Sequence, residues 1–119
     1  MCQTNPERSP VESEVLEHPS VEEIDLVEVL KALSDPARLR LLAVMGDGDY
    51  HACRAEVYDL DLHKSTLSHH FKVMREAGVT MTRVTGRNRE TRLRKEDLDA
   101  RFPGLVDSLI SGVTKEQTT

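Results

Sequence analysis

The stretch that decides the fold is KSTLSHHFKVMREAG, residues 64–78. Its buried-type positions recur at i, i+3, i+4 and i+7, namely at Leu67, His70, Phe71 and Met74. This spacing predicts an amphipathic helix over about 64–77, and Gly78 suits the left-handed backbone that often follows a helix. We therefore expect His70 at the edge of the core, holding one hydrogen bond, and its neighbour on the opposite, polar face.

The polar face of this helix carries short hydroxyls, one imidazole and lysines. We predict that it contacts DNA through Lys64, Ser65, Thr66, Ser68, His69 and Lys72. Small residues let a helix approach the major groove, hydroxyls bond phosphates or base edges, and lysines neutralise phosphates. Consecutive helical side chains do not face one another, so neither a shared metal on the two histidines nor a serine–histidine catalytic pair is expected. The chain is not expected to be an enzyme.

The flanking segments predict a helix-turn-helix followed by a wing. A short helix over 51–59 and the turn Leu60-Asp-Leu62 precede the 64–77 helix. Two strands over 79–84 and 90–94, joined by a turn at 85–89, follow it as a β-hairpin. The hairpin arginines are predicted to grip phosphate or enter the minor groove, and they are Arg83, Arg87 and Arg89. The alternative is a surface hairpin with ordinary solvated charges.

Three more helical segments are expected. Ser20-Val-Glu-Glu23 reads as a capping box, and the apolar spacing after it, at Ile24, Val27, Leu30 and Leu33, predicts a first helix. Asp35-Pro36 predicts the start of a second helix that runs to about Met45. A last helix begins near Lys95, is interrupted at 102–104 and then resumes. The predicted fold is mostly α with a β-hairpin wing, a winged helix-turn-helix of order α-α-α-α-β-β-α.

The length of 119 residues suits one domain. Residues 1–18 are expected to be a flexible acidic N-terminal tail, 19–112 the winged helix-turn-helix domain for DNA binding and dimerisation, and 113–119 a C-terminal tail. Apolar runs do not approach the roughly 18 residues of a membrane span, and no signal peptide is recognisable. With only two cysteines and no disulfide framework, the protein is expected to be cytoplasmic, without a membrane partner.

Charge is distributed unevenly. Residues 63–95 contain nine Lys or Arg against two Glu, a formal charge of +7 within a chain of −5. A basic stripe on an acidic body favours a polyanion, here double-stranded DNA. The alternative is a winged-helix interaction module whose basic face meets an acidic protein partner, and it predicts no preference for an inverted repeat.

Two motifs, LKALSDPARLRLLAVM and STLSHHFKVMREAGV, followed by strand, TGRNR turn and strand, resemble the ArsR/SmtB-type winged-helix repressors over about residues 24–95. The resemblance implies a homodimer that pairs through its first and last helices and releases operator DNA when an effector, often a metal ion, binds. Two positions depart from the family pattern. His63 stands where many members carry a capping serine, so that it or Asp61 must cap the helix, and Glu90-Thr91 replaces the usual aromatics.

The family's best-known metal sites do not transfer to this chain. Residues 102–119 contain no histidine for the zinc site of the C-terminal helix, and His51-Ala-Cys53 is one residue out of register with the family's Cys-x-Cys. No metal and no cofactor is therefore expected. Three alternatives stay open for Cys53: a partly buried apolar residue, a redox-responsive thiol, or a soft-metal ligand with His51 and Cys2. The effector is not identified by the sequence.

Overall fold

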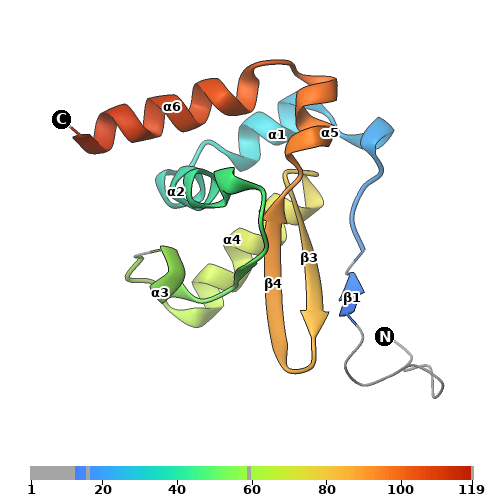
Figure 1. Cartoon of the computed structure of the whole chain (residues 1–119), viewed down its shortest axis with the longest axis vertical. Coiled ribbons are helices and arrows are strands. Elements are labelled where there is room, and N and C mark those ends of the chain that lie inside the picture. The colour runs from blue at the N-terminus through green and yellow to red at the C-terminus, as the bar shows by residue number, and fades with distance from the viewer. Residues whose placement is uncertain (1–12, 16, 59, 119) are drawn as a thin grey trace.

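The structure is a computed structural model that describes residues 13–15, 17–58 and 60–118. Its elements are β1 (Ser13–Val15), the 3-10 turn η1 (Val21–Glu23), α1 (Leu26–Ala32), α2 (Pro36–Val44), the 3-10 turn η2 (Met45–Asp47), β2 (His51–Ala52), α3 (Ala55–Tyr58), α4 (Lys64–Glu76), β3 (Thr80–Thr85), β4 (Asn88–Leu93), α5 (Lys95–Arg101) and α6 (Leu105–Thr118). Helix α4 lies beside the β3–β4 hairpin, which projects as a wing (Figure 1). The predicted winged helix-turn-helix is confirmed.

Helix α4 has the two faces that its sequence predicts. Its buried residues are Leu67, His70, Phe71 and Met74. The helix ends at Glu76, with Ala77 as its C-cap, and Gly78 follows with a φ of 87°. A Cβ at Gly78 would lie 2.6 Å from Ile24 Cγ1, so both backbone conformation and space require glycine there. This glycine lets α4 turn directly into the wing.

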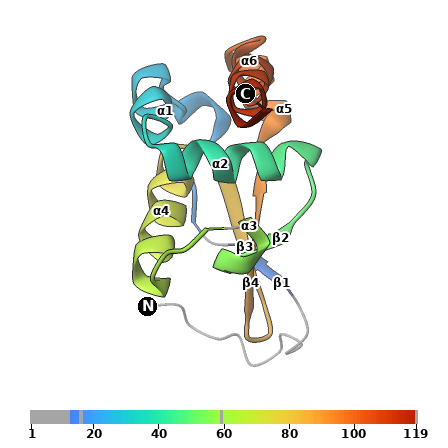
Figure 2. The ribbon, with the colours of Figure 1, turned by 90° about the vertical axis from the view of Figure 1, so that its left-hand side faces the viewer.

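Helix α2 is the centre of the core. It has α1 and α6 on one side and α3 and α4 on the other (Figure 2). Leu41 and Leu42 are fully buried, and the helix starts as predicted, with Asp35 accepting hydrogen bonds from the amides of Ala37 and Arg38. Tyr58 and Phe71 join this core with their ring centroids 5.5 Å apart. Helix α4 therefore packs against a core to which several helices contribute.

The first helix differs from the prediction. The capping box closes η1, where the Ser20 amide donates to Glu23 Oε1 at 2.8 Å. The chain is then extended at Ile24, and α1 begins afresh behind Asp25, which accepts from the Glu28 amide at 3.2 Å. This break shifts the phase of the helix. The apolar positions used to predict this helix therefore do not share one buried face: Val27 and Leu30 are 55% and 45% exposed, while Val29 and Ala32 are buried.

Two short strands were also not predicted. The sheet has the order β1-β3-β4-β2 and is antiparallel throughout. Strand β2 replaces the first part of the helix expected over 51–59, since His51 pairs with Thr91 along the β4 edge. Strand β1 pairs Ser13 with Thr85, so residues 13–15 are ordered where a flexible tail was expected. Open hairpin edges carry unpaired backbone groups, and these pairings satisfy them. Residues 1–12 lie outside the described part.

The C-terminal region shows the predicted interruption, with α5 and α6 separated at 102–104. Helix α6 continues to Thr118, past residue 112 where the domain was expected to end. The sequence after Gly112 contains no glycine or proline that would stop a helix. No helix in the described ranges is long and apolar enough to cross a membrane.

Candidate nucleic-acid interface

The outward face of α4 presents every residue that the sequence assigned to it. Lys64, Ser65, Thr66, Ser68, His69 and Lys72 are all exposed. His63 occupies the N-cap position, but its side chain makes no capping hydrogen bond. The first turn of α4 therefore presents backbone amides and the positive end of the helix dipole without a side-chain cap from that residue.

The wing brings two of its three predicted arginines to this face. Arg87 and Arg89 are exposed, and Gly86 forms the tight turn between the strands with a φ of 62°. A cleft of about 510 Å³ between α4 and the wing is lined in part by Arg54, Lys64, Ser68, Arg87 and Arg89. A smaller cleft of about 180 Å³ is lined in part by Ser68, Lys72, Arg75 and Arg89. Helix and wing thus form one continuous surface.

Arg83, the third predicted wing arginine, lies apart from the others. Its Nε donates to Glu90 Oε1 at 2.9 Å, and its guanidinium lies 3.8 Å from the centroid of the Tyr50 ring. Strand side chains alternate between faces, so Arg83 points to the face opposite its neighbour Thr82, which lines the cleft beside α4. The same alternation follows from the sequence of the predicted strand over 79–84, so a pattern in the sequence already separates Arg83 from the cleft.

Six basic side chains define what we call the α4–wing face: Arg54, Lys64, Lys72, Arg75, Arg87 and Arg89. None has a carboxylate within 4.0 Å among the described residues. Several basic residues elsewhere pair with acids, as in Arg92–Glu96 at 2.9 Å and Arg94–Asp97 at 3.0 Å. The positive charge of the α4–wing face is therefore left for an external polyanion. Sequence reasoning missed Arg54 and Arg75, although both belong to the helix-turn-helix region.

Comparison with known proteins agrees with this geometry. The family model described as "Bacterial regulatory protein, arsR family" matches residues 35–79, which run from the cap of α2 through α4. The uncharacterized HTH-type transcriptional regulator YceK of Bacillus subtilis is 34% identical over 83 residues, covering 69% of this chain and 83% of that protein. This chain belongs to the arsR family. It is a DNA-binding transcriptional regulator and not an enzyme.

Two further relatives have names that state a regulatory role. The arsenical resistance operon repressor of Staphylococcus xylosus is 35% identical over 75 residues, which cover 63% of this chain and 71% of the relative. The biofilm growth-associated repressor of Agrobacterium fabrum is 40% identical over 55 residues, 46% of each chain. Repression is thus the activity named among its relatives.

In this arsR-family chain the candidate thiol site has an unreactive environment. Burial is the largest influence on Cys53 and raises the pKa of its thiol to about 11, so the thiol is neutral near pH 7. His51 Nε2 contacts both carboxylate oxygens of Asp47 at 2.9 and 3.0 Å, and this contact lowers the pKa of Asp47. Within the described ranges no three His, Cys, Asp or Glu are grouped to hold a metal, and Cys2 lies outside them. The surroundings favour Cys53 as a partly buried apolar residue.

Proposed function

We propose that the protein is a homodimeric repressor that occludes an inverted-repeat operator. The observation that carries the proposal is the α4–wing face, with six unpaired cations around a hydroxyl-rich helix. Helix α4 enters the major groove, and the wing follows the neighbouring backbone or minor groove. The electrostatic term supplies affinity, while the polar face of α4 supplies sequence preference.

The residues of the α4–wing face divide between two roles. Lys64, Lys72 and Arg87 fix the register on phosphates, together with Arg89. Ser65, Thr66, Ser68 and His69 approach base edges from the exposed side of α4. Arg83 stabilises the wing through Glu90 and Tyr50 in place of the DNA contact that the sequence analysis assigned to it.

The dimer pairs through α1 and α6. Helix α1 exposes three large apolar side chains, Leu26, Val27 and Leu30, at 42%, 55% and 45%. On α6, Leu109, Ile110 and Val113 are only half-buried. Both helices lie on the side of α2 away from α3 and the wing tip (Figures 1 and 2). A second copy covers these apolar groups and leaves two α4 helices facing the DNA, about 34 Å apart.

The test is binding of the purified protein to DNA from upstream of its own gene, followed by fluorescence anisotropy over a salt series. We expect tight binding to a palindromic segment that weakens steeply with salt, with a slope of about −0.9 for each phosphate contacted. A matched duplex with one scrambled half-site serves as the control. Equal affinity for both duplexes and for random DNA, after a screen for distant operators, would instead favour the acidic protein partner.

The same DNA-binding measurements are repeated with zinc and with a mild oxidant. Cys53 is neutral and no described cluster suits a metal, so we expect neither additive to release the DNA. Release by either one would identify an effector site that includes residues outside the described ranges.

A further inference from the structure

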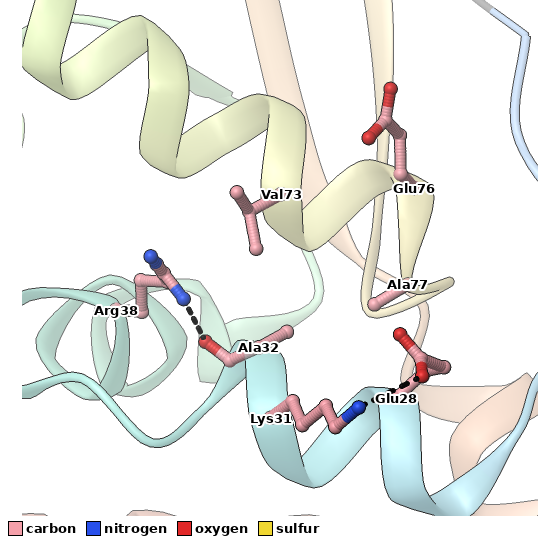
Figure 3. A pocket seen from close by; sticks show the side chains of 7 residues that line it. All are labelled: Glu28, Lys31, Ala32, Arg38, Val73, Glu76 and Ala77. Carbon is pink, nitrogen blue, oxygen red and sulfur yellow. Dashed lines mark hydrogen bonds and ion pairs between the residues drawn. The ribbon is translucent and has the colours of Figure 1, made fainter.

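Arg38 joins three helices at one point. It projects from α2, and its Nη1 donates to the carbonyl oxygen of Ala32, the last residue of α1, at 3.0 Å. Its Nε donates to Nδ1 of His70 in α4, also at 3.0 Å. The guanidinium borders a groove of about 300 Å³ between α1, α2 and α4, where Figure 3 shows its bond to Ala32.

The bond to His70 requires one protonation state. Nδ1 accepts from Arg38, so it carries no proton, and a neutral His70 holds its hydrogen on Nε2. The bond to Ala32 satisfies one of the carbonyls that have no partner at the end of a helix. A guanidinium can make both bonds at a fixed angle because its donors are rigid and planar. His70 is only 8% exposed, so water does not readily replace this partner.

We propose that Arg38 is a positioning residue for DNA reading: it holds α4 at a set angle to α1 through neutral His70, and protonation of His70 loosens α4 and weakens DNA binding. The inference rests on the proposed function, since α4 is the reading helix. Arg38 also connects α1, the proposed dimer helix, to α4, the reading helix, through hydrogen bonds.

Three charged or titratable groups face His70. Burial is the largest influence and lowers the pKa of His70; Asp35 at the α2 cap opposes this, while Arg38 and His69 add to it. His70 is therefore neutral near pH 7 and gains a proton only on the acid side of its ordinary range. Protonation removes the acceptor and places a second cation against Arg38, so the link between α2 and α4 is lost.

The first arm of the test compares two variants at about pH 7.5, where His70 is neutral. Arg38→Gln keeps a polar side chain but cannot make both bonds, and we expect operator affinity to fall about tenfold. Arg40→Gln removes the same charge from the same helix, and the Arg40 side chain takes part in none of the ion pairs among the described residues. We expect less than a twofold change for this control. Equal losses in the two variants would overturn the proposal.

The second arm uses His70→Asn, which places an oxygen acceptor where Nδ1 lies and does not titrate. We expect its affinity to match wild type at about pH 7.5, and the ratio of variant to wild-type affinity to rise severalfold at about pH 5.5. All other histidines are present in both proteins, so the ratio isolates His70. A ratio that stays constant with pH would overturn the proposal.

A third readout needs no DNA. Protection of the α4 amides in the free protein, taken as the exchange rate relative to the unstructured chain at the same pH, is expected to fall in Arg38→Gln and in acidified wild type, and not in His70→Asn or Arg40→Gln. If wild type bound no DNA at all, the proposed function would fail while exchange still showed whether Arg38 orders α4. Normal exchange in Arg38→Gln beside normal operator binding would reject the positioning role alone.

Discussion

At the scale of single residues, Lys72 tests whether α4 meets phosphate. It is exposed on the α4–wing face and has no acidic partner among the described residues. Lys72→Ala should weaken binding to operator and random DNA alike and flatten the salt slope by about 0.9, because one phosphate contact is lost. Anisotropy titrations at several salt concentrations measure this, with Arg40→Gln as the variant of equal charge change. An unchanged slope would show that Lys72 does not neutralise a phosphate.

His69 tests base reading at the same face. It lies on the exposed side of α4, one residue from a buried histidine. His69→Ala should relax the preference at a single base pair by about 1–3 kcal/mol and leave the salt slope unchanged. Competition against a panel of operators with one base pair altered measures the effect. A uniform loss over the whole panel would make His69 a backbone contact.

His70 predicts a pH dependence of stability. Burial lowers the pKa of His70 in the folded protein below its unfolded value of about 6.5, so the unfolded chain binds a proton more readily. Its contribution to the free energy of unfolding is fully present above about pH 6.5 and is lost as the pH falls from there through the lower folded pKa. Urea denaturation at a series of pH values measures this, and His70→Asn should show a shallower acid loss. Identical acid slopes would contradict it.

The sequence predicts features that depend on neighbouring residues and does not predict contacts between residues that are distant in the chain. The buried and exposed faces of α4 follow from the 3.6-residue period, which is local in sequence. The bond that His70 makes could be expected, but its donor could not, because Arg38 lies 32 positions away on another helix. The left-handed backbone of Gly78 was predicted from its place after a helix, whereas its close approach to Ile24 is known only from the tertiary structure.

At the scale of elements, the wing carries one arginine with structural contacts, Arg83, and others that we propose bind DNA, such as Arg89. Arg83→Gln should lower the free energy of unfolding by about 0.5–1 kcal/mol, since it removes a partly exposed ion pair with Glu90 and a contact with the Tyr50 ring. Its salt slope for DNA should match wild type. Arg89→Gln should leave the free energy of unfolding close to that of wild type and reduce the salt slope for DNA. Thermal melts and salt titrations of both variants measure the two effects, and a reduced slope for Arg83→Gln would return that residue to the DNA interface.

Long elements with a clear period were predictable, and short ones were not. Helix α4, the β3–β4 hairpin and the break between α5 and α6 follow from local pattern and turn residues. Strands β1 and β2 have three and two residues and exist only because the hairpin edges offer backbone partners. Helix α1 begins only at Leu26, because Ile24 is extended after the capping box, and the apolar side chains of Val27 and Leu30 are then exposed.

At the scale of the whole molecule, net charge misleads and charge placement informs. The chain carries −5, yet six cations without a carboxylate partner gather on the α4–wing face. Helix α1, which exposes apolar side chains, lies on the other side of α2 (Figure 2). One surface therefore suits DNA and another suits a second protomer, and the two are compatible with one bound assembly.

The exposed apolar side chains give the prediction that belongs to the assembly. Leu30→Glu places a charge in the proposed dimer interface, so we expect the dimer to dissociate and operator affinity to fall sharply, because one protomer engages a single half-site. Val57→Glu is the matched control, since Val57 is 38% exposed on α3, away from that interface. Sedimentation velocity over a concentration series measures the oligomeric state of each variant. If Leu30→Glu sediments as wild type does, α1 is not the dimer helix, and its apolar face must meet another partner.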